Sequence, residues 1–293
     1  AARAHTGRDR VISVGYHGWH DWYIGSTTRD KGVPAAVRAL TTAVPYGDLD
    51  ALADELAAHP GEVAAVILEP SGATVPPVGY LRGLVDACRD AGAVSVFDEV
   101  ITGFRLAPGG ARERYGVQPD LSCYGKALGN GMPIAAVAGS AEVMGELEEV
   151  FFSGTHGGEA LSLAAARAVL DTIADGTVLA AIEARGRTVL DGIAGLIDRH
   201  GVAEVVSVGG EPQRTVLAIG GDEPLVTKSW IQQCQAEAGC LFNGGVFVCA
   251  RHSDADVATM LAGFDRAFAE LAAGTDLSTL LAGPPVEPVF RAP

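Results

Sequence analysis

Two near-continuous apolar runs of strand length, each ending at an acidic residue, most constrain how this chain can fold. The first run, VAAVILEP (63–70), follows an amphipathic helical pattern that begins after a capping Asp48. The second run, AVSVFDEV (93–100), follows a helical pattern over residues 80–91. Apolar runs without alternation are typical of strands buried on both faces, and strands that alternate with helices form βαβ units. The sequence therefore predicts a mostly parallel sheet covered by helices.

Glu69 and Asp98 lie at the carboxyl ends of these two predicted strands. Because parallel strands end at the same edge of a sheet, we expect both carboxylates at one rim. Open α/β sheets bind their ligands in the crevice beyond that rim. The two acids are therefore the first candidates for a functional site.

The pattern changes after long Ala- and Leu-rich helical segments at 159–173 and 178–200. Beyond them, helical spacing alternates with three short apolar runs: VAEVVSV, TVLAIG and CLFNGGVFV. The sequence thus predicts a large domain (1–175), a smaller C-terminal α/β domain (176–275) and a tail (276–293).

Charge and composition exclude several classes of protein. The net charge of -15 repels a phosphate backbone and anionic membranes, so we expect no nucleic-acid or membrane partner. No apolar run reaches the roughly 18 residues that span a bilayer, and residues 1–10 lack the apolar stretch of a signal peptide. The five cysteines form no CxxC pair. We expect a cytoplasmic protein with reduced thiols and no bound metal.

Lys126 stands in the glycine-rich segment CYGKALGNGMP, which fits neither of the common phosphate-binding motifs. A P-loop requires glycine at position 120, which is Asp120, and a dinucleotide fingerprint requires glycine at Ile134. A functional lysine near strand ends and an ordinary solvated surface charge both remain open from this segment alone.

The segment GYHGWHDWY (15–23) concentrates aromatic and histidine side chains. Zinc ligation is disfavoured because His17 and His20 lack the spacing of HExxH and have no evident third ligand. A platform for a flat ligand and a packed corner of the core remain the two alternatives.

The motifs taken together resemble the class III aminotransferases, and within them the glutamate-1-semialdehyde aminomutase-like subgroup. The resemblance runs to about Leu271 and covers YHGWHD, ILEP, FDEVITGFR, PDLSCYGKALGNGMPIAAVAG and FSGTHGGEALSLAAA in the family's order. It implies a fold-type-I, pyridoxal 5'-phosphate (PLP) enzyme that moves an amino group between an amino donor and an aldehyde or keto acceptor. The alternatives that it leaves open are an aminomutase, which transfers the group within one molecule, and a non-catalytic fragment of such an enzyme.

The resemblance also implies the catalytic pair. Lys126 matches the lysine that holds PLP as an aldimine and then shuttles the proton of the substrate carbon. Asp98 matches the carboxylate that faces the pyridine nitrogen and keeps it protonated.

Further cofactor contacts follow from the same resemblance. Tyr16 and Val100 match the residues on the two faces of the pyridine ring, with His17 in support. Glu69 matches the acid on the hydroxyl side of the cofactor, with a rim salt bridge as the alternative. Thr155, in SGTHGG, matches a threonine that reaches the phosphate of PLP in the partner subunit, so a homodimer with shared active sites is expected. We also expect its hydroxyl and nearby amides to form an anion site where the helix opens at Glu159.

Family members carry roughly a hundred residues before the point at which this sequence starts. That part includes the loop that binds the PLP phosphate in its own subunit. We therefore expect this sequence to be an N-terminally truncated form, with weakened PLP binding.

Overall fold

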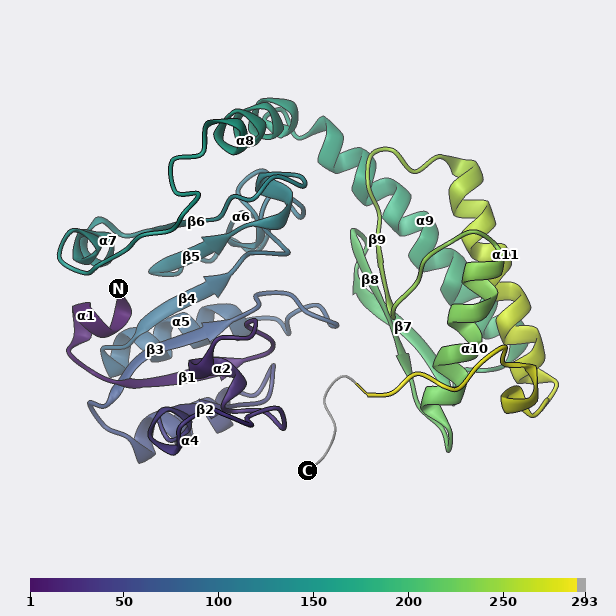
Figure 1. Cartoon of the computed structure of the whole chain (residues 1–293), viewed down its shortest axis with the longest axis horizontal. Coiled ribbons are helices and arrows are strands. Elements are labelled where there is room, and N and C mark those ends of the chain that lie inside the picture. The colour runs from purple at the N-terminus through teal and green to yellow at the C-terminus, as the bar shows by residue number, and fades with distance from the viewer. Residues whose placement is uncertain (289–293) are drawn as a thin grey trace. The chain divides into compact units, whose positions relative to one another are not determined.

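A six-stranded sheet and a three-stranded sheet organise the chain in this computed structural model, which describes residues 1–288 (Figure 1). The described residues divide into two compact units. Unit 1 comprises residues 1–72 and 76–176, and unit 2 comprises residues 73–75 and 177–288. No helix within residues 1–288 is both long and apolar enough to cross a bilayer.

Unit 1 contains the larger sheet. Its strands are β1 (Arg10–Val14), β2 (Thr41–Ala43), β3 (Val63–Leu68), β4 (Val94–Asp98), β5 (Leu121–Tyr124) and β6 (Ala136–Gly139). Its helices are α1 (Ala2–Thr6), α2 (Asp21–Ile24), α3 (Ala35–Arg38), α4 (Leu49–Ala58), α5 (Tyr80–Ala91), α6 (Ala111–Tyr115), α7 (Ala141–Gly145) and α8 (Ala160–Ile173), with short 3-10 turns η1 (Lys126–Leu128) and η2 (Glu146–Glu148).

The strand order is β2-β1-β3-β4-β5-β6, and every neighbouring pair is parallel except β5 and β6. The predicted mixed, mostly parallel sheet with flanking helices is therefore confirmed. In the register of β3 and β4, Leu68 pairs with Phe97. Glu69 and Asp98 are the next residues on their strands, so the two acids do end at the same rim.

Side-chain alternation buries both faces of the central strands. Val66, Leu68 and Phe97 face one side, where they pack with residues of α4 and α5 such as Leu84. Val96 faces the other side and packs with Val143 of α7. Each fully buried aliphatic or aromatic side chain contributes about 1.5–3 kcal/mol, so this double burial fixes the strands that carry the acids.

Local signals set the ends of the two helices between these strands. The Asp48 side chain accepts a hydrogen bond from the Ala51 amide at 2.8 Å and so caps α4. Helix α5 ends at Ala91, where the predicted helical pattern ends, and is capped by Gly92, whose φ of 65° is left-handed.

Unit 2 pairs an antiparallel sheet with three long helices. The strands are β7 (Val206–Glu211), β8 (Arg214–Ile219) and β9 (Gly245–Phe247), and the helices are α9 (Thr177–His200), α10 (Pro224–Glu237) and α11 (Asp254–Ala272), followed by η3 (Leu277–Leu280). Phe264 and Phe268 are fully buried in its core. The predicted tail thus begins with η3, whose Leu277 is buried in the same core, and its residues 289–293 lie outside the described residues.

Candidate active site

The predicted site residue at the end of β4, Asp98, is joined to His17 from the loop after β1. Asp98 Oδ2 lies 2.8 Å from His17 Nδ1, and His17 Nε2 donates to the carbonyl oxygen of Val14 at 3.1 Å. The His17 side chain is 1% exposed. Because a carbonyl can only accept, Nε2 is the donor in its contact with Val14. Both ring nitrogens of His17 thus have a partner, and the ring holds the Asp98 carboxylate in place.

The loop that carries His17 starts at Gly15, whose φ of 93° favours glycine. Tyr16 is 52% exposed, and its ring meets the buried ring of Tyr23 edge-on with a centroid distance of 5.7 Å. The Tyr23 ring also meets His17 edge-on at 5.4 Å. The loop thus combines a packed corner, formed by His17 and Tyr23, with one exposed ring beside it.

Glu69 lies on the neighbouring strand end, close to this loop. A Cβ placed on Gly15 would lie 3.9 Å from the Glu69 carboxylate. Burial raises the pKa of Tyr23, and the negative charges of Tyr16 and Glu69 raise it further. Tyr23 is a member of the site that the sequence motifs left without a role, although it belongs to the aromatic segment already singled out.

Val100 connects Asp98 with the segment of Lys126. Its amide donates to Asp98 Oδ1 at 3.2 Å, and its side chain lies 3.5 Å from where a Cβ on Gly125 would stand. Gly125 immediately precedes Lys126. The end of β4 and the segment of the candidate lysine are therefore neighbours. The pairing of β4 with β5 agrees with this, since Asp98 lies opposite Cys123.

Lys126 itself adopts an uncommon backbone conformation. Its φ is 40°, in the left-handed region that residues with a side chain rarely occupy. The side chain is exposed, and its amine forms no ion pair with any of residues 1–288. Strained positions of this kind cluster at functional sites, so the geometry favours a functional lysine over an ordinary surface charge.

Cys123, opposite Asp98 on β5, was not expected at the site. Burial, and then the Asp98 carboxylate, raise the pKa of its thiol to about 11. The thiol is therefore neutral near pH 7 and acts as a packing group. Only the register of β4 and β5 identifies it.

Thr155 lies in an exposed turn before α8, and Glu159 caps the start of that helix. The Glu159 carboxylate accepts hydrogen bonds from the amides of Leu161 at 2.8 Å and Ser162 at 2.7 Å. Hydrogen bonds from Ser162 and from these amides lower the pKa of Glu159, so its own negative charge occupies the helix end. A cofactor contact of Thr155 stays a prediction.

The residues present fit the cofactor that the sequence implies. A carboxylate with a hydrogen-bonded histidine suits a pyridine nitrogen, an exposed aromatic ring suits its face, and an unpaired primary amine suits an aldehyde. No group of three His, Cys, Asp or Glu side chains that could hold a metal occurs within residues 1–288.

The chain is similar in sequence and in fold to known proteins. The profile of the aminotransferase class-III family matches residues 2–231. Glutamate-1-semialdehyde 2,1-aminomutase of Dechloromonas aromatica (strain RCB) is 34% identical in a match that covers 92% of this chain and 70% of that protein.

Solved structures show the same fold. The PLP internal aldimine form of the FumI protein of Sphingopyxis sp. MTA144 is 30% identical, with a TM-score of 0.83 over 92% of this chain and 66% of that chain. An omega-transaminase from Sphaerobacter thermophilus is 23% identical, with a TM-score of 0.82 over 93% of this chain and 70% of that chain. The chain spans about two thirds of the length of the proteins that it matches. Because the family profile covers most of the sequence and the aminomutase is 34% identical, the chain belongs to the class-III aminotransferase family.

Proposed function

We propose that this chain supplies the catalytic residues of a PLP-dependent transfer of an amino group between an amino donor and an aldehyde or keto acceptor. The observation that carries the proposal is Lys126, which is exposed, has a left-handed backbone conformation and forms no ion pair with residues 1–288. Val100 lies between this lysine and Asp98, because its side chain lies beside Gly125 and its amide binds the Asp98 carboxylate. A cytoplasmic location is part of the proposal, because an acidic chain without CxxC pairs suits a reducing compartment.

The proposed roles follow from the chemistry of each side chain. When bound, PLP supplies an aldehyde that condenses with primary amines and a ring that withdraws electrons from the adjacent carbon. Lys126 Nζ is the amine that would hold the aldehyde end and would take and return the proton of the substrate carbon. The Asp98 carboxylate would face the ring nitrogen and keep it protonated. His17 holds Asp98 in place through the 2.8 Å hydrogen bond.

The remaining residues would position the ring. Tyr16 offers an exposed aromatic face, and the Val100 side chain, packed at the edge of Gly125, offers an apolar surface beside Lys126. Glu69, on the neighbouring strand end, would organise the hydroxyl side of the ring. Thr155 would contact the phosphate held in a partner subunit.

The test of this proposal is covalent labelling of the chain with PLP. The sequence has three lysines, Lys31, Lys126 and Lys228, so an adduct trapped by borohydride can be assigned to one residue by peptide mass spectrometry. We expect an absorbance band with added PLP and an adduct on Lys126. Both should vanish in Lys126→Ala and persist in the control variants Lys31→Ala and Lys228→Ala. An adduct spread evenly over the three lysines, or none, would favour a non-catalytic fragment.

A second candidate, intramolecular amino transfer, is supported by the 34% identity to a glutamate-1-semialdehyde 2,1-aminomutase. The two reactions use the same lysine and carboxylate. They differ in whether an external acceptor is required. Incubation of the PLP-loaded chain with an amino donor, with and without an added keto acid, separates them: product that forms only with the keto acid indicates intermolecular transfer.

The proposed homodimer is supported by exposed apolar side chains on both sides of Thr155. Phe151 is 96% exposed, Phe152 73% and Leu161 70%. Large exposed apolar surfaces mark interaction sites. We expect sedimentation to show a dimer that the double variant Phe151→Ser/Phe152→Ser weakens and the control Val78→Ser, at another fully exposed residue, leaves intact. A stable monomer saturated with PLP would contradict a shared active site.

A further inference from the structure

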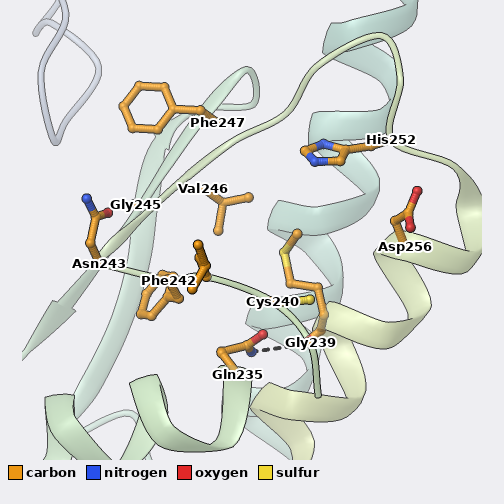
Figure 2. Close-up of a pocket in the computed structure, with 12 residues that line it drawn as sticks. Gln235, Gly239, Cys240, Phe242, Asn243, Gly245, Val246, Phe247, His252 and Asp256 are labelled. Carbon is orange, nitrogen blue, oxygen red and sulfur yellow. Dashed lines mark hydrogen bonds between the residues drawn. The ribbon is translucent and has the colours of Figure 1, made fainter. Parts of the chain in front are cut away.

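A second concave site lies in unit 2, and its lining includes none of the residues proposed for amino transfer. It is a pocket of about 660 Å3 between β9, the 239–244 loop and the helices α10 and α11 (Figure 2). Small-molecule sites typically enclose about 300–1,000 Å3 and have apolar walls with a few polar groups. The apolar walls here come from Cys240, Phe242, Val246 and Met260.

Gln235 of α10 forms the floor of the pocket. Its side chain is fully buried, and Nε2 donates to the carbonyl oxygen of Met260 at 2.9 Å. Its other amide atom, Oε1, finds no hydrogen-bond partner within residues 1–288. Figure 2 shows this side chain pointing from α10 toward the pocket. A buried acceptor without a donor is costly, so a ligand that brings a donor to Oε1 gains a hydrogen bond that the chain alone does not make.

The position of Gln235 is fixed by its neighbour on α11. A Cβ on Gly263 would lie within 2.9–3.0 Å of the amide atoms of Gln235, so the two helices approach closely only because residue 263 is glycine. The amide is therefore held in one place. This rigidity makes Oε1 a defined acceptor instead of a group that can turn away.

The rim carries a donor and an acid. His252 Nδ1 accepts a hydrogen bond from the Cys249 amide at 3.2 Å, so a neutral ring has its proton on Nε2. Figure 2 shows the His252 ring reaching over the pocket from the segment before α11. Asp256, also at the rim, accepts from Ser253 and keeps its negative charge there. The charge disfavours an anionic ligand.

We propose that this pocket binds a small, neutral aromatic molecule that carries a hydroxyl group. The aromatic body suits Met260 and Phe242, since thioethers and aromatic edges contact rings favourably. The hydroxyl donates to Gln235 Oε1. Because Oε1 is sealed from water, the side chains around it must shift to admit the hydroxyl.

Methyl NMR of the whole chain labelled at its methionines tests the proposal directly. The sequence has three methionines, and Met132 and Met144 of unit 1 are internal controls for Met260. The probes are p-cresol and toluene, which differ by the hydroxyl. We expect p-cresol to shift the Met260 methyl alone and to bind about fivefold more tightly than toluene, as one net hydrogen bond implies. Equal or tighter binding of toluene, or shifts shared by all three methyl groups, would overturn the proposal.

Two variants sharpen the test. Gln235→Met keeps the apolar shape but removes the acceptor, and we expect it to bind the two probes equally. If it does not fold, Cys240→Trp replaces it, since this partly buried loop residue would fill the pocket and abolish the Met260 shift. A p-cresol shift that survives Cys240→Trp would place binding elsewhere and refute the assignment. No PLP is present in these measurements, so their outcome is independent of the proposed amino transfer.

Discussion

Replacement of Glu99, the acid next to Asp98, should reduce the stability of unit 1 far more than replacement of any exposed acid. Glu99 is fully buried and accepts hydrogen bonds from the amides of Ala111 at 2.7 Å and Arg112 at 3.1 Å, and from the Thr102 hydroxyl at 2.8 Å. It thereby pins the start of α6 to the end of β4. In Glu99→Ala the buried Thr102 and Ala111 donors lose their partner, at about 1–3 kcal/mol each. Relief of the buried carboxylate offsets part of this loss, so we expect about 2–4 kcal/mol less stability.

The assay combines urea unfolding with hydrogen exchange of the peptide that contains α6. The wild-type amides of Ala111 and Arg112 should be protected, and Glu99→Ala should remove that protection. Glu113→Ala is the matched control, because this exposed acid on the same helix accepts, among residues 1–288, only from the Gly109 amide. We expect the control to cost at most about 1 kcal/mol. Equal costs for the two variants, with α6 still protected in Glu99→Ala, would refute the reasoning.

Three further predictions concern other contacts. Burial raises the pKa of Glu99 above its usual 4.5, so the folded chain binds this proton more tightly than the unfolded chain does. The protonated Glu99 therefore adds to the free energy of unfolding at low pH, and this stabilisation is lost as the pH rises above 4.5. Between pH 4.5 and 7, the urea midpoint of Glu99→Gln should therefore rise relative to that of the wild type. A difference between the two midpoints that does not change with pH would contradict this. With a pKa of about 11, Cys123 should react with iodoacetamide at pH 8 more slowly than Cys240, and Asp98→Asn should speed the reaction of Cys123. Labelling of Cys123 as fast as that of Cys240 would contradict this prediction. In α9, a Cβ on Gly186 would stand 2.1 Å from the Pro212 carbonyl oxygen, whereas Gly195 has open space. Gly186→Ala should cost about 1–3 kcal/mol in urea unfolding, whereas Gly195→Ala should stabilise by up to about 1 kcal/mol, and the reverse order would be inconsistent with the packing.

Local periodicity was enough to predict much of unit 1. Helix α5 spans the predicted residues 80–91, and β3 and β4 occupy the two apolar runs, because side-chain spacing of 3.6 or 2 residues is a property of short segments. The placement of Glu69 and Asp98 at one rim followed from the polarity of parallel strands. The family was also predictable, since its motifs are contiguous in sequence.

The sequence by itself thus determined the elements, the family and the identity of the candidate lysine and carboxylate. It did not determine which group each acid would meet. Asp98 and Glu99 are adjacent, yet one contacts His17, 81 residues away, while the other is buried against the start of α6. Likewise, only the folded chain shows that Glu159 occupies its own helix end and that Gln235 is sealed beneath a pocket. These outcomes depend on which strands and helices become neighbours, and hydrogen bonding and desolvation are fixed only when those distant segments pack together.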